Sequence, residues 1–422
     1  MIDRKSVLAL SLAGALLAAA GCGGGEGKTS SSVKETMQPF SVRQVVSANN
    51  ETGRTIMWQL AGKKDSTLEY RKKDSDVIQS VKAEGKAYQG GQGIGDSYIY
   101  TAHVEGLEKG NAYEYRTRTG DTVSKWYPMK TDTGEHFKAI VTSDSQSSDY
   151  SDWEKLFQGA VKRNPDADFF IDLGDIVDNG EDEYQWQAWF KTVSPTISEI
   201  PVVPAIGNHE AYSMDWKMTL PKRYLSHFAL PDNQDEKLKG HYYSFDWGDV
   251  HFTVLDTSLV EEKEWLPDLF EKQKVWAEQD IQKSKKKWKV VLMHKDPLQY
   301  SFADISRPHR EEGFSEEGKT FMPLFDKAGV DLVLSAHLHT YRDRGQIYDF
   351  KRDTKGPTYV ILGLGGNVRY PGLWKKHALD EYVAPQPETD NYTVLEASDD
   401  KLVLTGYLPD GTKLHETVVT KS

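Results

Sequence analysis

Five apolar runs of the chain each lead into residues that can bind a metal ion, and this ordered series constrains the fold more than any other feature. The residues are Asp144, Asp175, Asn208, His294 and the pair His337 and His339. Each follows a run rich in Val, Ile, Leu or Phe with the length of a buried strand. The series therefore predicts a site for two metal ions built from the ends of several strands.

The residue types fit that chemistry. Two cations about 3.5 to 4 Å apart can hold a phosphate ester and need one carboxylate that bridges them. Asp175 in FFIDLGD suits the bridge, because a Gly-Asp turn after an apolar run places a carboxylate at the strand edge. Asn208 in GNHE offers a carbonyl oxygen, and on an extended chain His337 and His339 would point the same way. Taken singly, each residue also suits an ordinary turn, cap or surface position; the joint order favours metal binding.

The series D…GD…GNHE…H…HxH resembles the calcineurin-like metallophosphoesterase superfamily, and HLHTYR (337–342) is similar to its purple acid phosphatase branch. The resemblance extends from about residue 38 to the C-terminus. It implies a four-layer αββα sandwich, with two sheets flanked by helices and a dinuclear site at the strand ends. It also implies an N-terminal all-β domain in front of the catalytic one.

The resemblance assigns roles to the series. One metal ion would be bound by Asp144, Asp175 and His339. The other would be bound by Asp175, Asn208, His294 and His337. His209 would contact the phosphate and assist the leaving group. Three weaker candidates for contacts with substrate or with the ligands are His309, Tyr341 and Arg342.

Two departures from the family pattern concern the first metal ion. Purple acid phosphatases carry a tyrosine three residues after the bridging aspartate, where this chain has Asp178, so the purple ferric chromophore is not expected. Other members have D-x-H in the first block, where this chain has Gln146. Gln146 could ligate through its carbonyl oxygen, or a water could take the place. Carboxylate and imidazole ligands suit iron, zinc or manganese without choosing among them.

Three functions are compatible with these residues. The first is an extracytoplasmic acid phosphatase that hydrolyses small phosphate monoesters with a metal-bound hydroxide as nucleophile. The second is a phosphodiesterase or nucleotide hydrolase with the same site. The third, motivated by Gln146 and Asp178, is a surface-anchored binding protein whose metal site has decayed.

Composition limits the partners. The 422 residues carry a formal net charge of −12, which argues against a protein that wraps polyanions. The one obvious basic cluster, residues 283–289, is typical of a solvated helix end. No nucleic acid is therefore expected as a partner beyond a possible nucleotide substrate, and the oligomeric state is left open.

The N-terminus is typical of a targeting segment. Asp3, Arg4 and Lys5 precede an apolar run that is too short for a spanning helix, so residues 1–21 are interpreted as a signal peptide. Cys22, the single cysteine, resembles a bacterial lipoprotein processing site, and residues 22–37 would be a flexible linker. The expected location is the bacterial cell surface or periplasm, lipid-anchored at Cys22. The alternative is an ordinary secretory signal with an incidental cysteine.

Two folded domains are expected. Residues 38–133 alternate short strands with turns and look like a fibronectin type III-like sandwich with Trp58 in its core. Residues 134–422 alternate strands and helices and form the metallophosphoesterase domain. Helices are predicted over 151–162, where Ser151 and Glu154 suggest a capping box, and over 181–191 and 264–283. Asp256, after DVHFTVL, is expected to be a turn or outer residue.

Overall fold

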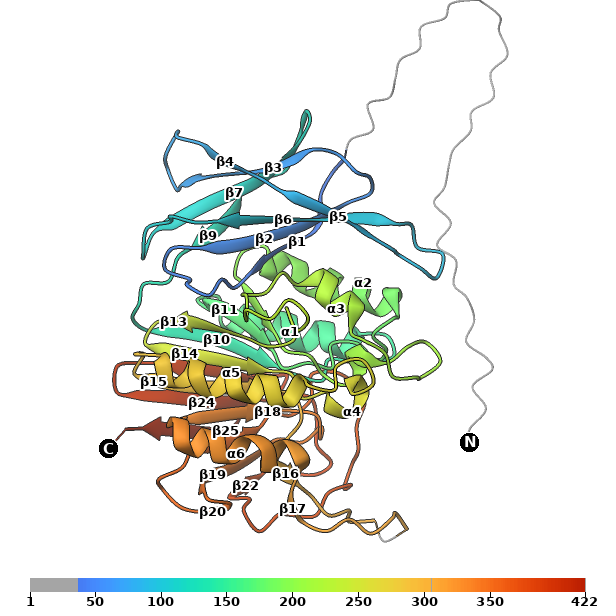
Figure 1. Cartoon of the computed structure of the whole chain (residues 1–422), viewed down its shortest axis with the longest axis vertical. Coiled ribbons are helices and arrows are strands. Elements are labelled where there is room, and N and C mark those ends of the chain that lie inside the picture. Colours follow the sequence, from blue (N-terminus) through green and yellow to red (C-terminus); the bar gives the residue numbers. More distant parts are fainter. Residues whose placement is uncertain (1–36, 305, 422) are drawn as a thin grey trace, which may run out of the picture. The chain divides into compact units, whose positions relative to one another are not determined.

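The N-terminal part of the chain is an all-β sandwich, seen in blue and cyan in Figure 1. The computed structural model describes residues 37–304 and 306–421. One sheet of the sandwich contains β3 (Ser66–Lys72), β4 (Gln79–Lys82), β7 (Ala112–Thr119), β8 (Thr122–Val123) and β9 (Tyr127–Lys130). The other contains β1 (Phe40–Val45), β2 (Arg54–Leu60), β5 (Glu84–Tyr88) and β6 (Ser97–Val104). Trp58 is fully buried in the core, so the predicted sandwich is confirmed.

The second sheet of the sandwich continues into the next domain. β1 pairs in parallel with β12 (Val202–Pro204), where Val45 lies opposite Val202. The result is one ten-stranded sheet, here called sheet A, in the order β25-β24-β23-β10-β11-β12-β1-β2-β6-β5. Across the same junction, the Tyr115 hydroxyl and the Gln44 amide both donate hydrogen bonds to the carbonyl of Ser198.

The rest of sheet A belongs to the C-terminal domain. It contains β10 (Phe137–Thr142), β11 (Phe169–Asp172), β23 (Tyr392–Ala397), β24 (Lys401–Tyr407) and β25 (Lys413–Thr420). Strands β10, β11 and β12 run parallel, so their carboxyl ends lie at one edge of the sheet. On its other side, β10 pairs with the antiparallel β23, and the sheet continues through β24 to the edge strand β25.

An eight-stranded sheet, here called sheet B, faces sheet A. It contains β13 (Tyr243–Trp247), β14 (Val250–Leu255), β15 (Trp288–Met293), β18 (Leu332–Ser335), β19 (Arg342–Tyr348), β20 (Lys351–Arg352), β21 (Thr358–Ile361) and β22 (Tyr382–Val383). Strands β14, β15, β18 and β21 are parallel. A separate small ribbon pairs β16 (Leu298–Gln299) with β17 (Gly313–Phe314).

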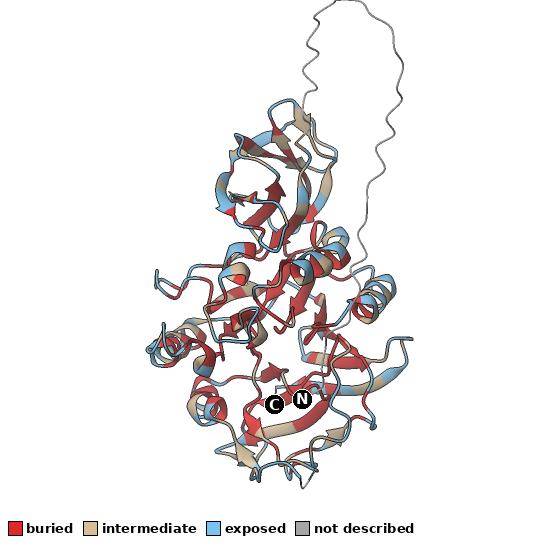
Figure 2. Ribbon diagram, turned by 90° about the vertical axis from the view of Figure 1, so that its right-hand side faces the viewer, coloured by how far each residue is buried: buried red, intermediate tan, exposed pale blue. Residues whose placement is uncertain are grey.

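Aromatic side chains fill the space between sheets A and B. The ring of Phe169 on β11 lies 6.1 Å from that of Phe245 and 5.9 Å from that of Phe252, both on sheet B. Figure 2 shows both sheets as largely buried. The central strands β11, β12, β14, β18 and β21 are buried throughout because both of their faces are covered, whereas β5, β20 and β25 are largely exposed.

Helices cover the outer faces. The helices are α1 (Ser151–Arg163), α2 (Glu183–Ile197), α3 (Lys222–His227), α4 (Leu259–Glu262), α5 (Leu269–Lys283) and α6 (Glu316–Ala328), with a short 3-10 turn η1 at His209–Ala211. Helix α1 packs on sheet A, where Phe157 contacts Phe170. Helices α5 and α6 share a core with sheet B. The predicted αββα sandwich is confirmed.

The helix predictions need three corrections. The capping box is wrong, because Tyr150 in a left-handed conformation precedes α1 and makes no side-chain cap, while Ser151 binds Asp149. Helix α2 begins at Glu183 after the capping residue Asp182. The segment 264–283 is helical only from Leu269, after the separate short helix α4.

In the described parts, residues 37–304 and 306–421, we find no helix with the length and apolarity that a membrane crossing requires. The expected signal peptide, Cys22 and most of the expected linker lie outside the described residues.

Candidate metal centre

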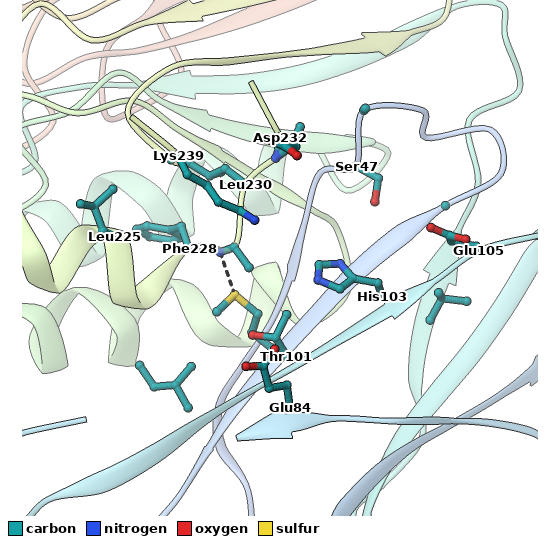
Figure 3. Close-up of a pocket in the computed structure, with 18 of the residues that line it drawn as sticks. Ser47, Glu84, Thr101, His103, Glu105, Leu225, Phe228, Leu230, Asp232 and Lys239 are labelled. Carbon is teal, nitrogen blue, oxygen red and sulfur yellow. Dashed lines mark hydrogen bonds between the residues drawn. The ribbon is translucent and has the colours of Figure 1, made fainter. Parts of the chain in front are cut away.

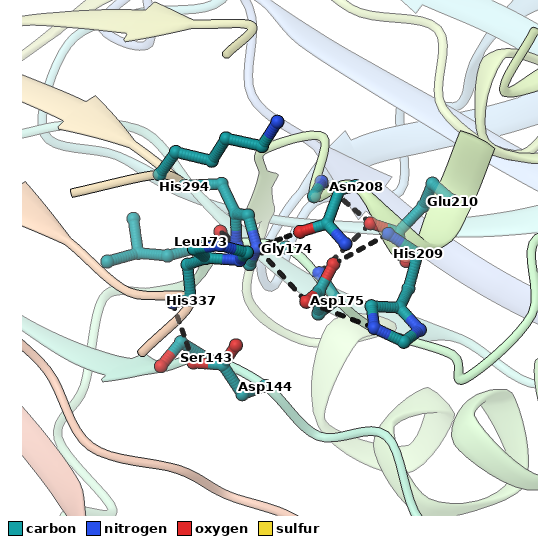
Figure 4. A network of polar contacts seen from close by, with 12 residues as sticks. Ser143, Asp144, Leu173, Gly174, Asp175, Asn208, His209, Glu210, His294 and His337 are labelled. Atoms are coloured by element: carbon teal, nitrogen blue, oxygen red, sulfur yellow. Dashed lines mark hydrogen bonds and ion pairs between the residues drawn. The ribbon is translucent and has the colours of Figure 1, made fainter. Parts of the chain in front are cut away.

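The candidate ligands come together beyond the carboxyl ends of the parallel strands of both sheets, and Figure 4 labels all of them except His339. From sheet A, Asp144 follows β10, Asp175 follows β11 and Asn208 follows β12. From sheet B, His294 follows β15 directly, and His337 and His339 follow β18. Residues spread over almost 200 positions thus face one another because parallel strands deliver their following loops to the same edge.

Five of the six residues form two overlapping groups that share Asp175, and the sixth, Asn208, lies beside His294. In one group, potential ligand atoms of Asp175, His294 and His337 all lie within 4.8 Å of one another. In the other, those of Asp144, Asp175 and His339 do so. One carboxylate common to two groups is the arrangement that a pair of bridged cations requires.

The His294 ring is oriented for binding on one nitrogen. Its Nδ1 lies 2.9 Å from the carbonyl oxygen of Leu173, to which it can donate. Its Nε2 lies 3.1 Å from Oδ2 of Asp175 and 3.2 Å from Oδ1 of Asn208. A histidine that ligates a metal commonly gives its other N–H to a backbone carbonyl in this way.

Several buried polar atoms of the site have no hydrogen-bond partner. They are Oδ1 of Asp144, Nδ1 of His337 and both side-chain polar atoms of Gln146, while Oδ2 of Asp175 is paired with His294. Unpaired buried oxygen and nitrogen atoms are costly in a folded protein. Bound cations would satisfy the oxygen atoms and the unprotonated nitrogen of His337, though not the NH₂ group of Gln146, so the donor set fits the metal ions that the sequence implies.

Burial and neighbouring charges set the protonation of the ligands. Burial raises the pKa of Asp144. For Asp175, burial acts in the same direction, but the nearby His294 and His209 outweigh it and hold the pKa of that carboxyl well below its usual range. Burial and then the charge of His294 lower the pKa of His337 far below its usual value. Asp175 is thus ionised and His337 neutral, which are the forms that bind metal. Burial would lower the pKa of His294, but the charge of Asp175 outweighs it and raises that pKa to about 9, so His294 has to lose a proton when a metal ion binds.

Four of the ligands adopt a left-handed backbone conformation. Their φ angles are 49° for Asp144, 53° for Asp175, 73° for His337 and 51° for His339. This region is uncommon for residues other than glycine, and such strain concentrates at functional sites. The expectation of an extended H-x-H segment is therefore wrong: the two histidines lie in a loop, where the backbone N–H of His337 donates to Asp144.

Glu210 connects the two loops that carry Asp175 and Asn208, a role that the sequence did not reveal. Its buried carboxylate accepts hydrogen bonds from the backbone N–H of Gly207 at 2.7 Å, of Ile176 at 2.8 Å and of Asp175 at 2.9 Å. Burial, followed by the charge of Asp175, raises the pKa of Glu210 to about 7. The sequence signal available for this role of Glu210 was its position next to His209 in GNHE.

The same two loops touch through glycine. A Cβ on Gly207 would lie 2.2 Å from the backbone nitrogen of Asp175, and one on Gly174 would lie 2.5 Å from the nitrogen of Gly207. No side chain fits between these backbones, which explains the glycines of the GD and GN turns.

His209 lies beside the ligand groups at the protein surface. Its backbone N–H donates to Oδ1 of Asp175 at 2.8 Å, and its Nδ1 lies 2.8 Å from the carbonyl oxygen of Asp178. Burial would lower the pKa of His209, but the charge of Asp175 and the Asp178 carbonyl outweigh it and the pKa is raised. The side chain keeps 17% of its surface exposed, so it can meet a ligand from solvent.

The two departures from the family pattern lie in different surroundings. Gln146 is fully buried, and its amide oxygen is available as a ligand. Asp178 is partly exposed, with Oδ1 3.6 Å from Nδ1 of His209. Asp178 thus contacts His209, and it belongs to neither of the two groups described above.

The structure does not bring His309, Tyr341 or Arg342 into the ligand groups. The His309 side chain is 83% exposed beside Glu311. The Tyr341 ring is fully buried against Tyr382 and His415, and Arg342 donates to Asp380 at 2.7 Å. Tyr341 and Arg342 therefore fix the chain that follows His339 from within the core.

A large cavity lies elsewhere, between the sandwich strands β2, β5 and β6 and the segment 225–240 (Figure 3). Its volume is about 1040 Å³, and its polar lining includes Glu84, His103 and Lys239. None of the candidate metal ligands lines it. The metal centre and this cavity are separate features.

Comparison with known families gives two matches along the chain. Residues 39–131 match the model of the purple acid phosphatase N-terminal domain. Residues 137–341 match the model of the calcineurin-like phosphoesterases and include all six candidate ligands. The sandwich and the part of the C-terminal domain that holds all six candidate ligands are therefore each matched by a family model.

Individual relatives agree with these matches. Purple acid phosphatase 23 of Arabidopsis thaliana is 30% identical over 187 residues, which cover 44% of this chain and 38% of that protein. Purple acid phosphatase 22 of the same plant is 27% identical over 346 residues, covering 77% and 75%. The solved purple acid phosphatase PPD1 from yellow lupin seeds superposes with a TM-score of 0.74 at 17% identity, covering 91% of this chain and 74% of that one.

The first of these relatives is much longer than its matching region, since the match spans only 38% of its length. The ordered ligands, the αββα fold and the two family models nevertheless agree with one another over residues 39–341. The chain belongs to the calcineurin-like phosphoesterases and carries a purple acid phosphatase N-terminal domain.

Proposed function

We propose that this protein is an acid phosphatase that hydrolyses small phosphate monoesters at two metal ions. The observation that carries the proposal is the single buried carboxylate of Asp175, which belongs to both ligand groups. When bound, the two cations would polarise the phosphoryl group and supply a water-derived nucleophile at neutral pH. Iron, zinc or manganese would suit the ligands, and an activity panel with each added metal distinguishes them.

The chain's own residues would orient the reaction. Asp175 fixes the spacing of the ligand groups, and the Leu173 carbonyl fixes the ring of His294. His209 is held by Asp178 and by the Asp175 carboxylate, with an exposed edge from which it can give a proton to the leaving oxygen. This arrangement favours catalysis over the alternative of a decayed binding site, because the six residues to which the resemblance assigns metal binding come together despite the departures at Gln146 and Asp178.

An aromatic rim beside His209 favours esters with a flat leaving group. The ring of Trp216 is perpendicular to that of His209 with centroids 6.0 Å apart, and the residue is 57% exposed. Tyr212 contacts both rings. An exposed indole next to the group that would protonate the leaving oxygen offers a stacking surface to an aromatic alcohol.

Replacing Trp216 with Ala is expected to raise KM for an aromatic monoester about five- to tenfold, since one lost aromatic contact contributes about 1 kcal/mol. The change in KM for a small aliphatic monoester should stay within about twofold. Trp216→Phe, which keeps a ring, should recover most of the affinity. Equal losses for both substrates in W216A would contradict the stacking role.

The second candidate function is a phosphodiesterase or nucleotide hydrolase, which uses the same dinuclear chemistry. Parallel assays on an aromatic monoester and the matching bis-aryl diester separate the two. The proposal expects kcat/KM to favour the monoester by at least about tenfold, a difference of about 1.4 kcal/mol in transition-state stabilisation. A preference for the diester would replace the first candidate with the second.

We further propose that the protein is exported and anchored by a lipid on Cys22 to a bacterial membrane. The support is the sequence pattern alone: an apolar run followed by Ala20, Gly21 and the single cysteine. Most of the wild-type protein should partition with membranes and into detergent, and most of a Cys22→Ala variant should not. Equal partitioning of the wild type and the variant would support the alternative, an ordinary secretory signal with an incidental cysteine.

A further inference from the structure

A second cluster of metal-binding side chains lies beyond the end of β14. It consists of His241, Asp256 and Glu262, whose potential ligand atoms all lie within 4.8 Å of one another. All three are buried, with at most 4% of each residue exposed. The neighbouring strand β15 pairs in parallel with β14, with Leu255 opposite Met293. Asp256 therefore follows β14 at the level where His294 follows β15.

The two carboxylates converge on one nitrogen. Nδ1 of His241 lies 2.8 Å from Oδ2 of Asp256 and 3.1 Å from Oε2 of Glu262. A ring nitrogen carries at most one proton, so it cannot fully satisfy two acids. Oε1 of Glu262 has no hydrogen-bond partner, and Oε2 has to share the His241 nitrogen with Asp256. A buried carboxylate that is paired so incompletely is strongly disfavoured.

His251 shows what a histidine satisfied by two acids looks like in the same domain. Its Nδ1 lies 2.7 Å from Asp246, and its Nε2 lies 2.9 Å from Asp280. Each nitrogen serves one carboxylate on opposite sides of the ring, which is an ordinary hydrogen-bonded arrangement. At His241 both acids instead approach the same nitrogen, as ligands around an ion do.

The spacing of the cluster resembles that of the dinuclear centre. There, His294 Nε2 is 3.1 Å from Asp175 and His339 Nε2 is 3.5 Å from Asp144. We propose that His241, Asp256 and Glu262 bind a third metal ion, a divalent cation of the zinc or manganese type. One imidazole nitrogen and two carboxylates suit such ions, and the second oxygen of Glu262 can supply a fourth ligand.

The third ion would have a structural role. Asp256 is already fixed by Gln273, which accepts from its N–H at 2.7 Å and donates to its carbonyl at 2.8 Å. The next residue, Thr257, accepts a hydrogen bond from the backbone N–H of Lys295, which follows His294. An ion on Asp256 and Glu262 would hold the segment 256–262 beside the dinuclear centre.

A proton is the competing occupant of the cluster. Burial, followed by the charge of Asp256, raises the pKa of Glu262 to about 8, so the acid could be neutral instead of metal-bound. Metal counting separates the two possibilities and is independent of phosphatase activity.

The test uses the full chain, stripped with a chelator, reloaded with Zn²⁺ and desalted before metal analysis. The wild type is expected to retain three zinc ions per chain and Glu262→Gln two. The matched control His251→Gln should retain three. Asp175→Asn should lose ions from the dinuclear centre and keep the third, which distinguishes a failure of this proposal from a failure of the proposed function. Equal zinc content in wild type and E262Q overturns the proposal.

A second measurement needs no variant. Anomalous diffraction from crystals of the zinc-loaded wild type should show a peak within about 2.0 to 2.2 Å of His241 Nδ1 and of oxygens from both carboxylates. Peaks confined to the centre around Asp175, or no peaks at all, overturn the proposal even if the variants misfold.

Discussion

Replacing Asp175 with Asn is expected to reduce kcat/KM for an aromatic phosphate monoester by at least about 10³-fold, because several kcal/mol of transition-state stabilisation depend on the metal pair. The substitution keeps the size of the side chain and removes the negative charge common to both ligand groups. The measurement is steady-state kinetics together with the metal content of the purified variant, which should fall by at least one ion.

The control for this experiment is Asp166→Asn. Asp166 is an exposed aspartate that pairs with Lys138 at 2.8 Å on the surface. The activity of D166N should stay within about twofold of wild type, since exposed ion pairs contribute little to the stability of the fold. If D175N kept activity within tenfold of wild type with both ions bound, Asp175 would not be the bridge and the two-metal proposal would be wrong.

The second large effect is expected at Glu210, and it concerns folding. Replacement by Ala leaves the buried N–H groups of Asp175, Ile176 and Gly207 without their acceptor. Each such loss costs about 1 to 3 kcal/mol, so the free energy of unfolding should fall by at least about 3 kcal/mol. Urea unfolding of the metal-free protein measures it without a contribution from bound ions.

Glu210→Gln provides the graded comparison. The amide keeps one acceptor oxygen, which can serve Ile176, and presents an NH₂ group to the donors of Asp175 and Gly207. The free energy of unfolding of E210Q should lie between those of the wild type and E210A. A fall of less than about 1 kcal/mol in E210A would mean that the glycine contacts alone hold the two loops together.

The layers and the ligand groups could be predicted because their signals are local. Each ligand follows an apolar run, and parallel strands carry such endings to one edge. The grouping of Asp144 with His339, and of His294 with His337, agrees with what the family resemblance implied. Trp58 as a core residue follows from the alternating pattern of its strand.

Other features depend on contacts between distant segments, which no local pattern encodes. The Glu210 carboxylate acquires its role only because two loops approach within van der Waals distance at Gly174 and Gly207. The capping box failed because Asp149 competes for Ser151. The convergence of Asp256 and Glu262 on His241 likewise joins separate segments, and of these residues the sequence singled out only Asp256, as a turn or outer residue.

Because β1 pairs with β12, the boundary between the two family modules is not a hinge. A parallel strand pair and the hydrogen bonds to Ser198 cross it. Rocking of one module against the other would break a sheet in its middle, so access to the metal centre has to be controlled by its own loops. Excising the N-terminal module would also uncover the edge of β12, a bare strand of the kind that recruits other chains.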